Sequence, residues 1–221
     1  MKNFIFVESC ESTQELLKEQ LEQNDSIELT VGCEHQIKGR GRSDNTWEEM
    51  PGTICFSMTV SPSEKVTFTA LEVSLLIQRF FATKGEEIFV KWPNDLISKN
   101  QKKCGGVLIQ NIDHHYLAGI GLNLYSNNDL FGGVFESQFS LNKKEWIQEL
   151  SEYISTHRYS TKVEITSDWL KQCYHLNSEV KITEGNLETI GTFVGLGPHG
   201  EAILHNADGN HHLFNGSLRL I

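Results

Sequence analysis

The segment Thr53–Val60 constrains the fold most, because apolar and polar residues alternate along its length. Successive side chains of an extended chain point to opposite faces, so Ile54, Phe56 and Met58 share one face. The pattern predicts a half-buried strand. Residues 64–84 follow with apolar side chains at helical spacing around much of the circumference, which predicts a core helix. Together they indicate a sheet packed against helices.

The remaining patterns divide the chain near residue 177. We predict strands at Phe4–Val7, Glu28–Val31 and Ile88–Trp92, a hairpin of Gly106–Asn111 with Tyr116–Leu124, and helices from Ser12, over 142–157 and over 166–176. Only short strands and turns follow, at Val180–Ile182, Thr189–Leu196, Ala202–His205, His212–Phe214 and Leu218–Ile221. The expected fold class is α+β, with a mixed sheet packed with helices over residues 1–177 and a small β-barrel over residues 178–221.

Charge and cysteine content argue against several classes of protein. The chain has 19 Lys and Arg against 29 Asp and Glu, a formal charge of −10, which is unlike a protein that binds duplex DNA. Apolar runs such as Leu75–Ile77 are far below the ~18 residues of a membrane span, and Glu8 comes too early for a secretion signal. The five cysteines are widely spaced without a CxxC pair, which indicates reduced thiols. We expect a cytoplasmic protein with no nucleic-acid or membrane partner.

Glycine and arginine are concentrated in the first candidate site segment, Gln36–Ser43. Glycine lets the backbone approach a ligand closely, and Arg40 and Arg42 are spaced to clamp phosphate oxygens. The segment lacks the GxxxxGK[ST] pattern of a Walker A loop. A flexible, solvated basic loop has the same composition, so the segment is ambiguous when taken alone.

A polar pair interrupts the strand pattern in the second segment, Lys91–Leu96. Pro93 ends the strand and places Asn94 and Asp95 behind it, where a carboxylate suits magnesium or a ribose. An ordinary Pro-Asn-Asp turn has the same sequence, so this segment alone does not distinguish a ligand site from a turn.

Glycines interrupt two further strand patterns. In Lys103–Leu108 a lysine precedes two glycines, which suits a carboxylate or phosphate ligand, although a surface lysine beside a bulge also fits. In Gly119–Leu124 the glycines and the polar Asn123 indicate that something packs against the strand, the alternative being a β-bulge without a ligand.

Two motifs match binding patterns in letters only. Gly195–Gly200 matches GxGxxG, but it contains a proline, lies between strands and opens no helix, which excludes a dinucleotide site. The pairs His114-His115 and His211-His212 match metal ligands in type, but adjacent strand residues point to opposite faces and no third ligand is near, which argues against a metal site.

The order and spacing of these segments resemble the biotin protein ligase family. The resemblance lies in Ser12-Thr13-Gln14, Gln36 with Gly39-Arg40-Gly41-Arg42, Trp47, the KWPND run Lys91–Asp95, Lys103-x-Gly105-Gly106-x-Leu108 and Gly119-x-Gly121-x-Asn123. It implies the family's mixed-sheet catalytic fold and a Src-homology-type barrel at the C-terminus. Because the motifs begin within a dozen residues of Met1, we expect the short form without a DNA-binding domain.

The resemblance implies an ATP-dependent ligase. Biotin would be activated to biotinyl-AMP and then transferred to a lysine of a biotin carboxyl carrier protein, either of acetyl-CoA carboxylase or of another carboxylase. ATP, magnesium and biotin are the expected ligands, with no tightly bound metal. A homodimer is also possible by this resemblance, with strand 106–111 as a candidate contact.

The family match also implies a role for each motif residue. Lys103, Arg40 and Arg42 are expected to be catalytic, because they would cancel the negative charge of a carboxylate and phosphates. The expected biotin site comprises Ser12, Thr13, Gln14, Gln36, Gly39, Arg40, Gly41, Arg42, Lys103, Gly105, Gly106, Gly119 and Gly121. The expected ATP or adenylate site comprises Arg40, Arg42, Trp47, Asn94, Asp95, Lys103 and Asn123, with Asp95 also a candidate magnesium ligand. The Gly39–Asn45 loop is expected to be mobile and to close over the adenylate.

Some residues depart from the family pattern, and two other functions stay open. Gln14 stands where relatives often carry Asn, and Ser43-Asp44 stands where they carry Gly or Arg, so we expect Asp44 to weaken retention of the adenylate. A lipoate or octanoate protein ligase or transferase shares the fold, and a long apolar pocket would favour it. A non-catalytic biotin-binding module is the other alternative, against which Lys103 and the two arginines argue.

Overall fold

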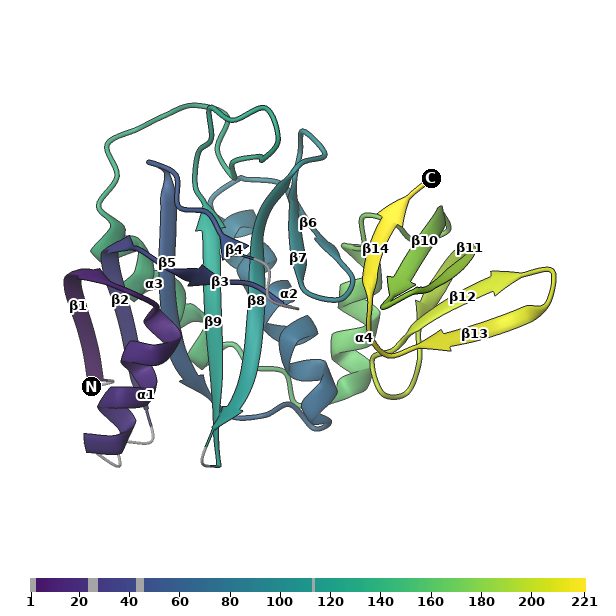
Figure 1. Cartoon of the computed structure of the whole chain (residues 1–221), viewed down its shortest axis with the longest axis horizontal. Coiled ribbons are helices and arrows are strands. Elements are labelled where there is room, and N and C mark those ends of the chain that lie inside the picture. The colour runs from purple at the N-terminus through teal and green to yellow at the C-terminus, as the bar shows by residue number, and fades with distance from the viewer. Residues whose placement is uncertain (1–2, 24–27, 43–45, 113) are drawn as a thin grey trace.

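A mixed seven-stranded sheet forms the larger part of the protein. The computed structural model describes residues 3–23, 28–42, 46–112 and 114–221 (Figure 1). The sheet has the order β1-β2-β5-β9-β8-β7-β6, in which β1 and β2 are parallel and every other neighbouring pair is antiparallel. Its strands are β1 Asn3–Cys10, β2 Leu29–Gln36, β5 Thr53–Val60, β6 Ile88–Lys91, β7 Asp95–Ser98, β8 Lys103–Ile112 and β9 His115–Asn123. The predicted mixed sheet is confirmed, and β7 is a strand that the sequence analysis did not predict.

Helices cover both faces of this sheet. They are α1 Thr13–Gln23, α2 Thr69–Thr83 behind the short 3-10 turn η1 Val66–Phe68, α3 Lys143–Thr156 and α4 Lys162–Lys171. Helix α1 contacts β2, β5 and β9, whereas α3 contacts β2 and β5 and packs with α2. Residues Thr53 to Met58 are therefore all buried, so the prediction that β5 is half-buried was wrong.

Helix α2 lies in the core. Among the described residues, the helical stretch Val66–Thr83 is long and apolar enough to cross a membrane. The short apolar runs in the sequence did not indicate such a stretch. Within the protein, however, 67% of this stretch is buried. Its apolar side chains join the main cluster that also contains Ile54 and Phe56 of β5. The stretch is therefore a core helix, as the sequence predicts.

Five antiparallel strands follow near the C-terminus. Their order is β13-β12-β11-β10-β14. The strands are β10 Glu179–Glu184, β11 Leu187–Leu196, β12 Ala202–Asn206, β13 Gly209–Leu213 and β14 Ser217–Leu220. Helix α4 begins before the predicted residue 166, because Thr161 and Glu164 form a reciprocal capping box. The small β unit is thus confirmed, and each predicted strand overlaps an observed one.

The KWPND turn, which connects β6 to β7 in the larger sheet, contacts the C-terminal strands. Trp92 is 1% exposed, and its indole Nε1 donates to the carbonyl oxygen of Gly200 at 3.1 Å. Gly200 ends the GxGxxG run, which forms the connection between β11 and β12 rather than a nucleotide loop. Phe193 and Leu218 of the small sheet belong to the same apolar cluster as α2. The turn between β6 and β7 is therefore held against the C-terminal strands.

Candidate functional site

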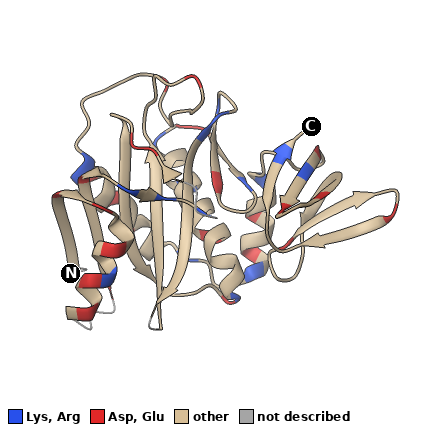
Figure 2. Ribbon diagram, viewed as in Figure 1, with Lys and Arg blue, Asp and Glu red and all other residues tan. Residues whose placement is uncertain are grey.

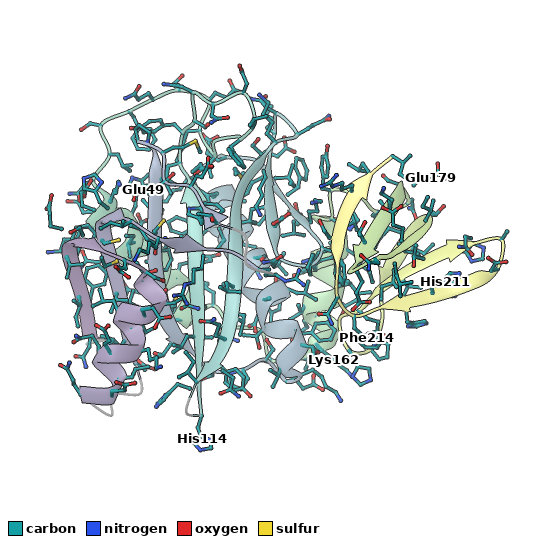
Figure 3. The ribbon with its side chains drawn as sticks, in the orientation of Figure 1. Glu49, His114, Lys162, Glu179, His211 and Phe214 are labelled. Carbon is teal, nitrogen blue, oxygen red and sulfur yellow. The ribbon has the colours of Figure 1, made fainter. Side chains whose placement is uncertain are left out.

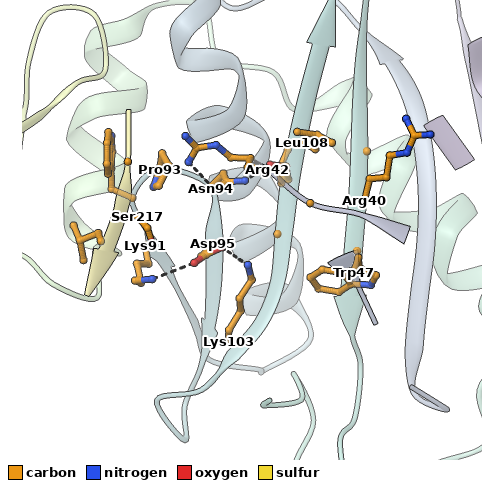
Figure 4. Close-up of a pocket in the computed structure, with 18 of the residues that line it drawn as sticks. Arg40, Arg42, Trp47, Lys91, Pro93, Asn94, Asp95, Lys103, Leu108 and Ser217 are labelled. Atoms are coloured by element: carbon orange, nitrogen blue, oxygen red, sulfur yellow. Dashed lines mark hydrogen bonds and ion pairs between the residues drawn. The ribbon is translucent and has the colours of Figure 1, made fainter. Parts of the chain in front are cut away.

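The four motif segments converge on one cavity of about 670 Å³. Its walls come from the start of α1, the end of β2, the segment around β3 (Gly39–Arg40) and β4 (Thr46–Trp47), the β6–β7 turn, and β8 and β9 (Figure 4). Strands β10 and β14 close it from the C-terminal side through Lys181, Ser217 and Arg219. Segments separated by more than a hundred residues thus share one site.

A carboxylate between two lysines forms the charged part of the cavity. Asp95 Oδ1 lies 2.5 Å from Lys103 Nζ, and Asp95 Oδ2 lies 3.1 Å from Lys91 Nζ (Figure 4). Burial alone would raise the pKa of Asp95, but the positive charges of Lys103 and Lys91 outweigh it and lower the pKa. The Lys103 side chain is 38% exposed and lines the cavity, so a ligand in the cavity can contact it. Lys91 is a site residue that the sequence analysis quoted but did not assign.

Arg42 adds a third cation. Its Nη1 donates to Asn94 Oδ1 at 3.4 Å, and the Asn94 side-chain amide donates to the carbonyl oxygen of Val107. Burial lowers the pKa of Arg42, while the nearby Asp95 acts in the opposite direction. Three cations therefore surround one carboxylate, which leaves this end of the cavity positive and suited to phosphate or carboxylate oxygens.

Arg40 lies apart from this cluster. Its Nη1 forms an ion pair of 2.8 Å with Glu15 on α1, and both side chains are substantially exposed. Figure 4 shows Arg40 on the opposite side of the drawn site from Asp95, and Figure 2 shows the acidic residues on α1. The predicted clamp of Arg40 with Arg42 is not assembled in this structure, because Arg40 is paired with Glu15 whereas Arg42 donates to Asn94.

The glycines of β9 make room for two side chains. A Cβ atom on Gly121 would lie 2.5 Å from Trp47 Cε2, and one on Gly119 would lie 3.0 Å from Gln14 Cδ. The Trp47 ring therefore lies flat against β9, with Lys103 Nζ 5.9 Å from its centroid. The prediction that something packs against these glycines is confirmed, and the packing groups are this chain's own side chains.

Uncharged hydrogen-bonding groups form the other end of the cavity. Gln36 Oε1 accepts hydrogen bonds from Thr13 N at 2.9 Å and from Thr13 Oγ1 at 3.0 Å. Ser57 Oγ donates to Thr13 Oγ1 at 2.9 Å. Ser12 also lines the cavity. This wall suits a ligand group that is polar and neutral.

Gln14 belongs to the same wall, and Gln110 behind it is a partner that the sequence did not indicate. Its Nε2 donates to Gln110 Oε1 at 3.1 Å and approaches the carbonyl oxygen of Leu108 at 3.5 Å. Its Oε1 is buried without a partner. An unpaired buried acceptor costs about 1–3 kcal/mol, so this atom is one that a ligand N–H would satisfy.

Three of the predicted site residues stand behind the cavity wall. A Cβ on Gly105 would overlap the Leu122 side chain, and one on Gly39 would meet the Trp47 carbonyl oxygen at 2.5 Å, so both glycines serve close packing. Asn123 is 2% exposed and accepts a hydrogen bond from Thr53 Oγ1 at 2.8 Å. These positions support the wall, whereas Gly41, Gly106, Gly119 and Gly121 line it. Ser43, Asp44 and the rest of the 43–45 part of the predicted closing loop lie outside the described residues.

The C-terminal contribution was also missed from the sequence. Lys181 and Arg219 are register partners on β10 and β14, and both line the cavity. Neither lies in a motif, and basic residues on strand patterns are common, so the sequence carries no distinguishing signal for them.

Asp95 does not fit a magnesium ligand in this arrangement. Both of its oxygens are held by ammonium groups, which repel a cation. Among the described residues no group of three His, Cys, Asp or Glu side chains could hold a metal ion. Each of the five cysteines is a free thiol, and burial raises the pKa of Cys55 and Cys104 to about 12, which makes these two poor nucleophiles.

The fold thus brings a cationic end and a neutral polar end together in one cavity. A family model described as the biotin/lipoate A/B protein ligase family matches residues 6–127. The chain therefore belongs to this family.

Curated relatives are similar over part of their length. Biotin–protein ligase 2 of Arabidopsis thaliana is 30% identical over 105 residues, which are 42% of this chain and 32% of that protein. The bifunctional ligase/repressor BirA of Bacillus spizizenii is 27% identical over 140 residues, 59% of this chain and 43% of that protein. The chain thus spans less than half the length of these relatives.

Solved structures are similar over the whole chain. A biotin protein ligase from Aquifex aeolicus, in complex with biotin and ATP, has a TM-score of 0.84 at 26% identity and covers 100% of both chains. A biotin acetyl coenzyme A carboxylase synthetase from Helicobacter pylori has a TM-score of 0.74 at 19% identity, covering 96% of this chain and 100% of that one, and supports the fold alone.

Proposed function

We propose that the protein is a biotin protein ligase, which activates biotin with ATP and transfers it to a lysine of a carrier protein. The observation that carries the proposal is the division of one cavity into a cationic end and a neutral polar end. Lys103, Lys91 and Arg42 form the first, and Thr13 and Gln36 form the second. Biotin has a carboxylate at one end and a neutral ureido group at the other, so its chemistry matches both.

The proposed reaction has two steps. A biotin carboxylate oxygen attacks the α-phosphorus of ATP, the bond to pyrophosphate breaks, and a mixed anhydride with AMP forms. The carrier lysine amine then attacks the acyl carbon, loses a proton and forms an amide as AMP leaves. Both reactants of the first step are anions, so the site must cancel their repulsion and hold them in line.

Lys103 is the residue we assign to that task first. It has the exposed ammonium of the cluster, and Asp95 orients it. Arg42 supplies a second charge beside Asn94, and we assign the flat face of Trp47 to the adenine. Arg40 can contact the ligand only after its ion pair with Glu15 breaks. Breaking this pair costs little free energy, because an exposed ion pair contributes about 0–1 kcal/mol.

Magnesium enters the proposal only as the partner of the ATP phosphates. Mg²⁺ is commonly held by substrate phosphates and water rather than by a protein cage. We assign no step to it and no ligand role to Asp95.

The wider assignments follow from the family. We propose a biotin carboxyl carrier domain as acceptor, a cytoplasmic location, and a division into a catalytic unit of residues 1–177 and a Src-homology-type barrel of residues 178–221. The pairing of β8 supports homodimer formation through this strand. On one edge β8 pairs with β9 from Gly105 to Ile112, whereas on the other edge, among the described residues, only Lys103, Gly105 and Gly106 pair with β7.

ATP–pyrophosphate exchange with biotin, lipoate or octanoate tests the proposal. We expect exchange with biotin alone, because a hydrocarbon end would leave the buried Gln14 Oε1 without a partner and would lie against the polar wall of Thr13 and Gln36. Exchange with lipoate or octanoate alone would assign the protein to the sister activity, and no exchange with any acid would remove the support for Lys103.

A further inference from the structure

A buried lysine holds both ends of the cavity-lining segment between β2 and β5. Lys143, the first residue of α3, has a side chain that is 6% exposed. Its Nζ donates to the carbonyl oxygen of Glu34, where the segment leaves β2. The same nitrogen lies 2.9 Å from Glu49 Oε1, where the segment returns toward β5. The excursion that carries Arg40, Arg42 and Trp47 is therefore closed at its base by one ammonium group.

Glu49, which Figure 3 labels, continues this contact to a residue of the cavity wall. Its Oε2 accepts the backbone N–H of Gln36, and Gln36 Oε1 in turn accepts from Thr13 N and Thr13 Oγ1. An unbroken polar path thus runs from Lys143 through Glu49 and Gln36 to Thr13. Gln36 and Thr13 line the cavity, whereas Lys143 stands behind it.

The path depends on charge. The Glu49 side chain is only 17% exposed, and the ammonium that pairs with it is 6% exposed, so Lys143 neutralises Glu49 and keeps it in this orientation. The exposed His35, whose Nδ1 lies 3.4 Å from Glu49 Oε1, is a weaker partner for that oxygen. Without the ammonium, the Glu49 carboxylate is better stabilised by turning toward water and becoming hydrated. The Gln36 N–H then loses its acceptor.

Docking of α3 does not require this lysine. Ile147, Leu150 and Ile154 on the same helix are completely buried in the main apolar cluster. These three side chains can therefore dock α3 without Lys143. None of them replaces the link from Lys143 through Glu49 to Gln36.

We propose that Lys143 is a positioning residue, which acts through Glu49 to hold Gln36 and Thr13 in place for the neutral end of the ligand. This inference rests on the proposed function, in which that end is the biotin ureido group. It adds a residue outside the motifs and outside the cavity lining.

The test is the KM for biotin in ATP–pyrophosphate exchange, measured for Lys143→Met well below its melting temperature. We expect KM to rise at least about tenfold with a smaller fall in kcat, because a displaced Gln36 weakens binding of a group remote from the reacting carboxylate. Lys143→Arg should restore most of the affinity. Adding Glu49→Gln to Lys143→Met should give no further increase, because the two residues act along one path.

Arg158→Met is the matched control. Arg158 neutralises the buried Glu72 away from the cavity, so its loss lowers the melting temperature without changing the KM for biotin. A Lys143→Met enzyme whose KM stays within about twofold of the parent, or rises no more than that of Arg158→Met, would overturn the positioning role alone. A parent protein without biotin-dependent exchange would overturn the proposed function, and this inference with it.

Discussion

Two carboxylates have lowered pKa values in different surroundings: Asp95 is partly buried in the cavity wall, and Glu72 is fully buried in the core. Glu72 is 0% exposed, and its oxygens accept from Arg158 Nε, Arg158 Nη2, Ser63 Oγ and Tyr159 N. Asp95 is held by two lysines, and Lys103 keeps 38% of its side chain exposed. Burial raises the pKa in both cases, and the surrounding hydrogen bonds and cations overcome it.

The difference lies in what the partners can still do. Four donors converge on the Glu72 carboxylate, so the cluster ties the segment after α3 to α2, and neither Glu72 nor Arg158 lines the cavity. Lys103 has donors left over and faces an open cavity. A saturated ion-pair cluster stabilises the fold, whereas an unsaturated one can act on a substrate.

Glu72→Gln should produce the largest change in stability. It leaves Arg158 partly buried without its counter-charge, and breaking a buried pair in this way costs about 3–5 kcal/mol. Urea denaturation should show the loss, while exchange activity per folded molecule stays unchanged. A loss below about 1 kcal/mol would mean that Glu72 is not the structural counterpart of Asp95.

Lys103→Ala should have the opposite profile. We expect the biotin-dependent exchange rate to fall by about 10²–10³, because one charge-stabilising donor is removed from the reacting groups. Lys91 still pairs with Asp95, so the melting temperature should change little. A variant that unfolds but retains its specific activity would reverse the comparison.

His175 extends the comparison to a buried base. It is 0% exposed between Trp169 and Phe193, and burial, assisted by the charge of Lys91, lowers its pKa to about 3. Between pH 6.5 and 3 the unfolded imidazole binds a proton and the folded one does not, so stability falls as pH falls through this window. The limiting slope is about 1.4 kcal/mol per pH unit.

His175→Phe separates this effect from those of the carboxylates. The stabilisation from Asp95 and Glu72 is present above their ordinary values of 3.8 and 4.5 and is lost at lower pH. The slope of unfolding free energy between pH 6.5 and 4.5 should therefore become shallower in the variant. An unchanged slope in urea titrations across that range would contradict the role of His175.

Glu15→Gln should have the smallest effect on stability. The Arg40–Glu15 pair is exposed, so its loss changes the free energy of unfolding by about 0–1 kcal/mol. Because the variant frees Arg40, the KM for ATP should stay equal or fall. A rise in that KM would indicate that Glu15 positions Arg40 rather than holding it away.

Much of the fold follows from local pattern. The alternation at Thr53–Val60, the helical spacing of residues 64–84 and the short C-terminal strands each predict an element that the structure contains. Strands β3, β4 and β7 were missed, because two residues carry no periodicity and the residues after Pro93 read as a turn. The burial of both faces of β5 was missed because α1 covers its polar face from elsewhere in the chain.

Sequence order and spacing alone were enough to single out the motif segments and their family resemblance, since glycine, lysine and arginine at those positions have few structural uses together. Tertiary structure decided which of those residues meet. It separated Arg40 from Arg42, placed Asn123 behind the wall, and brought Lys91, Arg219 and the Lys143–Glu49 pair to the site. Local sequence cannot specify such contacts, because they join strands and helices that are distant along the chain, and charge acts through space.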